Sequence, residues 1–256
     1  MEWEAPAIAL DARPYGEGDA IVTVMTEDHG AHRGLVRGGA SRAQSGLWQP
    51  GNFIQIRWTA RLSDSLGAFR GELIRANAAQ VMDDPLALAI LTATCAVTEA
   101  ALPEREPHPR VFDGLLRLIA HLPLGLDLVP DLVRWECVLL AELGYGLDLE
   151  RCAVTGETGG LRYVSPRTGR AVSDGAAGVW ASRLLPLPGF LRVNGSSTPP
   201  TIVDLCDGLR LTAHFLTRDA FGQRHRPLPQ ARVMLYDRLA AMLDTKAGES
   251  ETQDAG

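Results

Sequence analysis

The chain has 256 residues and a formal net charge of −6, with 46% hydrophobic and 22% charged residues. This composition is typical of a globular protein with a sizeable core, and the length suits one large or two small domains. Because no apolar run reaches about 18 residues and the chain opens with MEWEAP, we expect neither a membrane span nor a secretory signal, and predict a cytoplasmic protein.

Cysteine and lysine usage argues against several kinds of site. The cysteines at 95, 137, 152 and 206 form no CxxC pair, which disfavours zinc and structural disulfides. Lys246 is the single lysine, so a Walker-type phosphate loop is excluded and Schiff-base chemistry is implausible. His29 and His32 form an HxxH pair without a clear carboxylate partner, so we expect no metal there. No hydrolase motif is readable, and we predict a non-enzyme without a cofactor.

Residues 1–78 are predicted to form a small antiparallel β-barrel. Alternating segments punctuated by turn glycines follow one another, beginning with a strand in EAPAIALDA and a loop in ARPYGEGDA. The predicted strand 52–62 has two distinct faces, because side chains alternate along a strand. Its apolar face holds Ile54, Ile56, Trp58, Ala60 and Leu62, and its outer face holds Phe53, Gln55, Arg57, Thr59 and Arg61.

Charge is distributed unevenly along this region. Residues 1–28 hold seven acids against one arginine, a net charge of −6, whereas residues 29–75 hold seven arginines against two acids, a net charge of +5. A basic antiparallel barrel usually binds nucleic acid. The alternative is that Phe53 packs under a loop and the arginines are solvated. The first 28 residues supply strands to the same barrel, so the surface can be basic only if the acidic side chains of those residues face away from it.

The predicted DNA-binding residues combine arginines with aromatic side chains: Arg33, Arg37, Arg42, Trp48, Phe53, Arg57, Arg61 and Arg70. Trp48 has an equal alternative, which is to cap the barrel. A secondary basic patch near Phe221 could extend the DNA path or receive an acidic partner tail; its members are Arg218, Arg224, Arg226 and Arg232. A third group, Arg162, Arg167 and Arg170, is interpreted as a solvated turn.

The pattern changes to helices after Asn77, and residues 79–246 are predicted to form a helical domain. Asp83-Asp84-Pro85 indicates a helix start, a second helix begins near Pro109, and a third spans 131–143 and ends at Gly144. A turn-rich insertion with short strands is expected over 148–174. Further helices are expected over 175–185, 198–217 and 229–246, followed by a disordered tail at 247–256.

Several segments together resemble the RecO family of bacterial DNA repair proteins. They occur in order over nearly the whole chain: RPYGEGDAIVTVMTEDHG, LVRGGASR, LWQPG, WTARL, LPEREPHP, LAELGYGLDLERCAVTG, YVSPRTGRAVS and LPGFL. The resemblance implies an α+β protein with an N-terminal OB-fold, a helical domain and, in some members, a zinc-binding insertion. Here Cys152-Ala153-Val154-Thr155 retains one thiol and residues 170–180 offer none, so we expect a degenerate, zinc-free insertion.

The resemblance also implies a function in recombinational repair at the nucleoid. Members of the family bind single- and double-stranded DNA, anneal complementary strands, bind the acidic C-terminal tail of single-strand DNA-binding protein, and help RecR to load the recombinase. We therefore predict a recombination mediator. The alternative is an adaptor that recruits proteins and has little DNA affinity. A nuclease would need an acidic metal cluster, which we do not find in the sequence.

Overall fold

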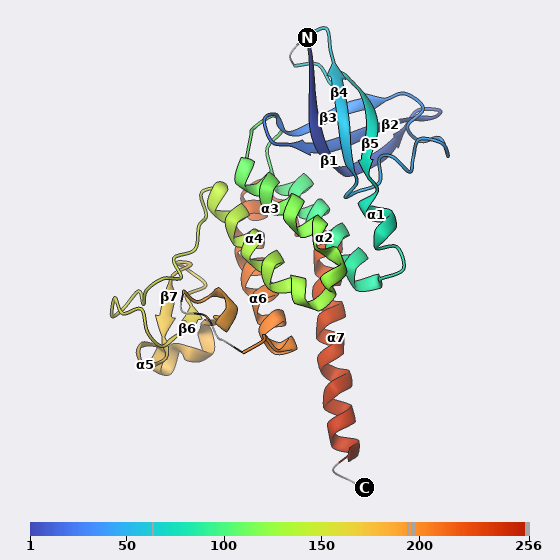
Figure 1. Ribbon diagram of the computed structural model, residues 1–256. Coiled ribbons are helices and arrows are strands. Elements are labelled where there is room, and N and C mark those ends of the chain that lie inside the picture. The colour runs from blue at the N-terminus through green and yellow to red at the C-terminus, as the bar shows by residue number, and fades with distance from the viewer. Residues whose placement is uncertain (63, 194, 196–197, 254–256) are drawn as a thin grey trace. The chain divides into compact units, whose positions relative to one another are not determined.

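The computed structural model describes residues 1–62, 64–193, 195 and 198–253 (Figure 1). The chain divides into two compact units, Met1–Leu128 and Val129–Gly256. The first unit contains a β-barrel and three α-helices, and the second contains further helices with a small sheet. None of the helices in the described ranges is long and apolar enough to cross a membrane.

Five strands close into the predicted barrel in the order β1-β2-β3-β5-β4, with β1 also pairing with β4. The contacts are antiparallel except between β3 and β5, which pair in parallel at Leu35 and Ala68. This is the arrangement of an OB-fold, and it confirms the predicted fold class. The strands are β1 (Glu2–Tyr15), β2 (Asp19–Thr26), β3 (Gly30–Val36), β4 (Phe53–Thr59) and β5 (Ala68–Arg75).

The two predicted faces of β4 are confirmed within the strand. Ile54, Ile56 and Trp58 are at most 3% exposed and belong to the barrel core. The prediction that this strand continues to Leu62 is wrong, because β4 ends at Thr59 and Leu62 is 70% exposed. The chain leaves the sheet there, since Thr59 is already paired with Ala68, the first residue of β5.

The first strand is longer than predicted and is buried on both sides. The segment expected to be a loop continues β1 as far as Tyr15, because it pairs with β2 up to the contact of Tyr15 with Asp19. Ala7 and Ala9 face the barrel core, where only small side chains fit between the larger ones of neighbouring strands. Ile8 is also fully buried, although it lies outside the core cluster, and helix α2 packs against this strand.

The helices of the first unit begin and end close to the predicted positions. The Asp84 carboxylate accepts hydrogen bonds from the amides of Leu86 and Ala87 at 2.9 and 3.0 Å, and Pro85 occupies the first turn, so the predicted helix start is confirmed. The predicted start at Pro109 is also confirmed. The elements are α1 (Asn77–Gln80), α2 (Pro85–Ala101), α3 (Pro109–Ala120) and the 3-10 segment η1 (Leu122–Leu128).

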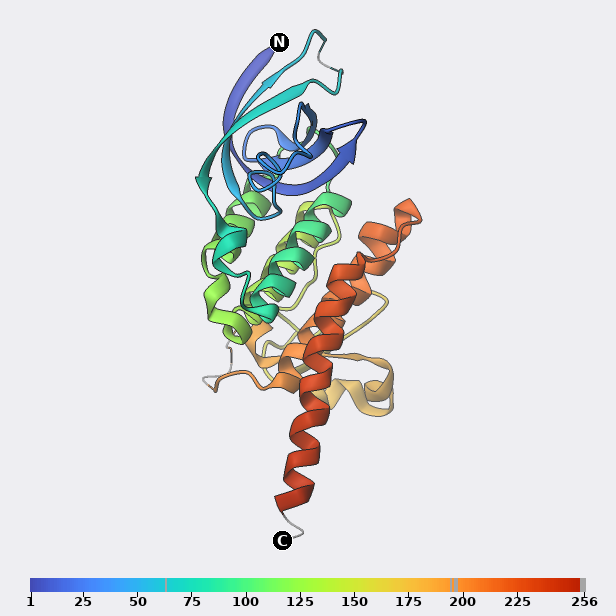
Figure 2. The ribbon, with the colours of Figure 1, turned by 90° about the vertical axis from the view of Figure 1, so that its right-hand side faces the viewer.

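Three longer helices form the body of the second unit: α4 (Val129–Glu142), α6 (Ile202–Phe215) and α7 (Gln230–Gln253). The chain turns after α4 at Gly144, whose φ of +86° favours glycine. A π-helical turn, η4 (Leu216–Phe221), and a 3-10 turn, η5 (Gly222–Arg224), follow α6. Helix α7 is the long red helix of Figure 2. It continues past the predicted end at Lys246 to Gln253, while 254–256 lie outside the described residues.

The insertion between α4 and α6 contains a three-stranded sheet in the order β7-β6-β8. The helix predicted over 175–185 is only one short α-helical turn followed by a 3-10 segment, because Gly178 with φ +48° interrupts it. The elements are β6 (Leu161–Val164), β7 (Ala171–Ser173), α5 (Asp174–Ala177), η2 (Gly178–Arg183), β8 (Leu185–Pro186) and η3 (Gly189–Leu191).

The single thiol of the insertion is held by hydrogen bonds. The buried Cys152 Sγ accepts from the Ser173 amide at 3.3 Å and from the Ser173 hydroxyl at 3.4 Å. Burial raises the pKa of this thiol, but hydrogen bonds from Ser173 and Thr155 outweigh it and lower the pKa to about 6. The contacts of Cys152 therefore fix the insertion's first turn to β7.

Candidate nucleic-acid interface

Three of the predicted DNA-binding arginines lie on connections of the barrel rather than on its strands. Arg37 and Arg42 begin the β3–β4 connection, and Arg61 lies in the β4–β5 connection. All three are exposed, and none has an ion pair with another residue in the described part of the chain. They are therefore cationic groups that are available to bind phosphate.

Backbone hydrogen bonds place these connections beside one another. The Ala40 amide donates to the Gly18 carbonyl, in the β1–β2 turn, at 3.0 Å. The Leu35 amide donates to the Gly67 carbonyl, at the end of the β4–β5 connection, also at 3.0 Å. The start of the β3–β4 connection thus lies between the β1–β2 and β4–β5 connections. These two connections border the oligonucleotide site of OB-folds.

Two other predicted arginines are already engaged by carboxylates. Arg33 on β3 contacts Glu99 and Glu104, each at 3.1 Å. Arg57 on β4 contacts Glu2, and its Nε lies 3.2 Å from Glu4. A phosphate at either arginine would have to compete with these partners. No local sequence signal indicates this pairing, because the carboxylate partners of Arg33 lie far away along the chain, Glu99 by 66 positions.

The requirement that the acids of the first 28 residues face away is not met at Glu2 and Glu4. Both lie on the outer face of β1, where Glu4 is opposite Arg57 in the register. A shallow hollow of about 470 Å³ next to this pair is bordered by Glu4 and Glu72 as well as by Arg57 and Arg70. Arg70 is exposed, with no ion pair among the described residues. The outer sheet face therefore carries mixed charge.

The two predicted aromatic contacts differ in accessibility. Phe53, at the first position of β4, is half-buried and can still offer an edge to a ligand. Trp48 is 1% exposed and stacks near Phe69, with ring centroids 6.4 Å apart. A Cβ atom on Gly71 would lie 2.8 Å from its ring, so the indole fills the space that this glycine leaves. Of the two alternatives for Trp48, the structure supports capping of the barrel, because a buried ring offers no face to a base.

The histidines of the HxxH motif contact Trp3 at one end of the barrel. His29 stacks on Trp3 with ring centroids 4.0 Å apart. His32 is 4% exposed, lies edge-on to Trp58 at 5.0 Å, and neither ring nitrogen has a hydrogen-bond partner among the described residues. Burial, with smaller contributions from the charges of Arg105 and His29, lowers its pKa from 6.5 to about 4. His32 is therefore a neutral core residue.

The buried His32 is expected to make the protein less stable in acid. Its pKa is lower in the folded than in the unfolded state, so stability is complete above pH 6.5 and falls as the pH is lowered toward 4. Urea unfolding at pH 7 and pH 4.5 should show a His32-dependent loss of about 2 kcal/mol. His32→Leu should show a smaller loss, because leucine does not titrate. An identical pH dependence in both proteins would contradict this assignment.

The secondary basic patch is not assembled as predicted. Arg224 and Arg226 are exposed, and Arg218 donates from Nη1 to the Pro166 and Arg167 carbonyls and from Nε to Asp219. Arg232 is fully buried, so its assignment to a surface patch is wrong.

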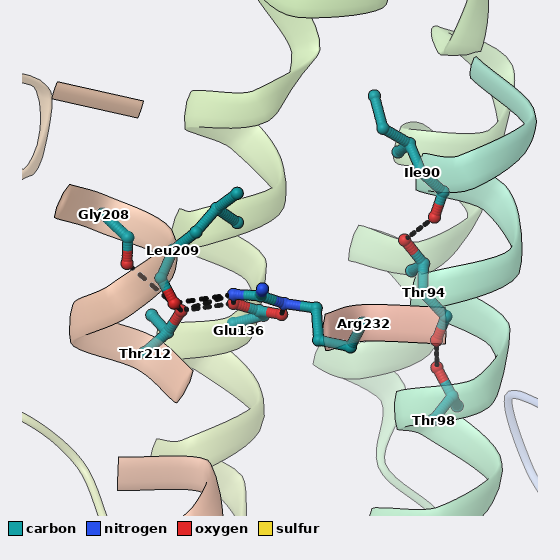
Figure 3. Close-up of polar contacts among 8 residues, drawn as sticks. All are labelled: Ile90, Thr94, Thr98, Glu136, Gly208, Leu209, Thr212 and Arg232. Atoms are coloured by element: carbon teal, nitrogen blue, oxygen red, sulfur yellow. Dashed lines mark hydrogen bonds and ion pairs between the residues drawn. The ribbon is translucent and has the colours of Figure 1, made fainter. Parts of the chain in front are cut away.

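Arg232 instead forms a buried ion pair with Glu136 of α4 (Figure 3). Its Nε donates to Glu136 Oε1 at 2.5 Å, and its Nη2 donates to Oε2 and to the Leu209 carbonyl, each at 2.9 Å. The sequence spacing of Arg232, Leu235 and Leu239 could have indicated that Arg232 is buried, since these positions share one helix face and both leucines are buried.

The fold defines an OB-fold protein, and exposed arginines lie on its connections. Family models for the recombination protein O N terminal and C terminal match residues 1–77 and 82–227. The chain belongs to the RecO family of DNA repair proteins.

Three similar relatives are each named DNA repair protein RecO. The proteins of Granulibacter bethesdensis, Gluconacetobacter diazotrophicus and Acidiphilium cryptum are 58%, 56% and 53% identical to this chain. The alignments cover 96%, 94% and 95% of this chain and 98%, 96% and 98% of the relatives. The likeness therefore extends over both compact units.

Proposed function

We propose that this protein binds single-stranded DNA through the connections of its barrel. Arg37, Arg42 and Arg61 bind phosphates, Arg70 extends the contact along β5, and Phe53 contributes an aromatic edge. The observation that carries this proposal is the placement of three exposed arginines that have no carboxylate partner among the described residues. Arg61 lies on the β4–β5 connection, which OB-folds use for oligonucleotides, and Arg37 and Arg42 lie on the adjoining β3–β4 connection. Arg33 and Arg57 are left out of the contact set because carboxylates hold them.

We further infer that the bound strand is used for annealing and recombinase loading. Neutralising phosphates allows two complementary strands to approach, which requires no nucleotide cofactor. Membership of the RecO family supports a mediator that acts on single- and double-stranded DNA in the cytoplasm, at the nucleoid. In this proposal the partners are RecR and the acidic tail of single-strand DNA-binding protein.

A second candidate is an adaptor with little DNA affinity of its own. The observation that favours it is the neutralisation of Arg33 and Arg57, together with a net charge of −6 for the whole chain. In that case the protein would recruit partners to DNA that other proteins hold.

Annealing of complementary oligonucleotides coated with single-strand DNA-binding protein tests the two candidates together. A mediator should raise the annealing rate above that of the coated strands alone, and should bind the bare oligonucleotide in an anisotropy titration. An adaptor should bind single-strand DNA-binding protein only when that protein keeps its acidic tail, and should leave bare DNA unbound. Absence of both activities would contradict both candidates.

A further inference from the structure

A tryptophan on the insertion stands on the surface of the second unit. Trp180, in the 3-10 segment η2, is 57% exposed, and the preceding Val179 is 89% exposed. The other four tryptophans of the chain are half-buried or buried, in the barrel and in α4. Burial of large aromatic rings stabilises folded proteins, so an exposed ring contributes little to this fold and is available to a ligand.

An arginine already lies against this ring. The Arg183 guanidinium carbon is 5.1 Å from the Trp180 ring centroid, which is within the range of a cation–π contact. Arg183 has no carboxylate partner in the part of the chain that the structure describes. The pair therefore presents an aromatic surface and an uncompensated positive charge at one place. Single-stranded nucleic acids are bound by this combination, because bases stack on the ring while the cation attracts phosphate.

The charge around the pair also favours a polyanion. Residues 143–201, the insertion between α4 and α6, contain six arginines and four acids, a net charge of +2, although the whole chain carries −6. Arg170 is paired with Asp148 at 3.3 Å, and Arg162 approaches Asp174 only to 3.9 Å. An excess of positive charge therefore remains on the insertion.

We propose that Trp180 and Arg183 form a second site for single-stranded nucleic acid, on which a base stacks while the arginine binds the adjacent phosphate. This inference rests on the proposed function, since annealing brings two strands together and the barrel supplies a site for the first. Trp180 and Val179 stand on the surface beside Arg183, so the ring is open to a stacking base.

Fluorescence of Trp180 tests the site directly. Oligothymidylate should quench the emission of the wild-type protein, and the quenching should be largely absent in Trp180→Phe. It should persist in a variant with Arg37, Arg42 and Arg61 changed to glutamine, because those residues lie in the other unit. Polyglutamate serves as the control polyanion: quenching by it, without quenching by oligothymidylate, would assign the site to an acidic protein and overturn the inference.

Capture of a second strand gives the functional measure. The protein is first bound to an immobilised oligonucleotide, and its capture of a second, labelled strand is then measured. Trp180→Ala combined with Arg183→Gln should weaken this capture about tenfold. Trp180→Tyr should retain most of it, because tyrosine also stacks. Met234→Ala, which removes another exposed apolar side chain of the same unit, is the matched control and should change nothing.

The two proposals fail in distinguishable ways. If the wild-type protein binds no single-stranded DNA in anisotropy titrations, the proposed function is wrong. If it binds one strand normally and neither the fluorescence nor the second-strand capture depends on Trp180, only the second site is wrong. Urea unfolding of Trp180→Ala should match that of the wild type, since the exposed ring lies outside the core.

Discussion

Replacing Arg37, Arg42 and Arg61 together with glutamine is expected to weaken single-stranded DNA binding about 100-fold at roughly 0.1 M salt. Each phosphate contact on a single strand contributes about 0.7 to the slope of log K against log salt. Loss of three contacts should therefore lower the slope by about 2. The measurement is fluorescence anisotropy with a labelled oligonucleotide over a range of salt concentrations. We expect the substitutions to leave the folded state unaffected, because these exposed side chains make no ion pairs with described residues.

The matched control for this variant is the pair Arg33→Gln and Arg57→Gln. It also removes positive charge from the barrel, but from arginines that carboxylates already hold. We expect its salt slope to stay close to that of the wild type. If the control reduced the slope as much as the triple variant does, the strand would bind across the sheet face of β4 and not along the connections.

Replacing Arg232 with leucine is expected to destabilise the second unit by about 3 to 5 kcal/mol. The change leaves the fully buried Glu136 carboxylate without its cationic partner; among the described residues it keeps the hydrogen bond from the Thr212 hydroxyl. Urea unfolding followed by the fluorescence of Trp135, which neighbours Glu136 on α4, measures the effect. A surface DNA contact at Arg232 would instead alter the salt slope of binding and leave the unfolding midpoint unchanged.

A second substitution separates the missing partner from simple loss of packing. Changing Glu136 to methionine in the Arg232→Leu background removes the unpaired charge and fills similar space. Most of the lost stability should return, since apolar replacement of a complete buried ion pair is often neutral or stabilising. A double variant as unstable as Arg232→Leu alone would show that the buried charge is not the cause.

Local patterns in the sequence were sufficient to predict the barrel and most of the helix boundaries. Alternation in β4 placed Ile54 and Ile56 in the core, and Asp84-Pro85 marked the start of α2. These features depend on a few neighbouring residues, so they can be read without the rest of the fold. Alternation also placed Arg57 on the outer face, where the structure confirms its exposure.

The partners of charged side chains could not be read in the same way. Arg33, Arg37, Arg57 and Arg61 look alike in the sequence, yet the structure divides them into arginines held by Glu99, Glu104, Glu2 and Glu4 and arginines without such partners. Strand register and helix packing decide which carboxylate reaches which arginine. Trp48 and Trp180 differ for the same reason, since only tertiary packing buries one ring and exposes the other.

The sequence by itself determined that this protein is an OB-fold followed by helices, with an arginine-rich first part and the features of the RecO family. Hydrophobic periodicity and turn residues act over short distances, so they define strands and helices locally. The tertiary structure alone decided which arginines are free to bind a strand, that Arg232 is buried with Glu136, and that Trp180 stands exposed beside Arg183. Electrostatic pairing and burial depend on residues that are distant in the chain and become neighbours only when it folds.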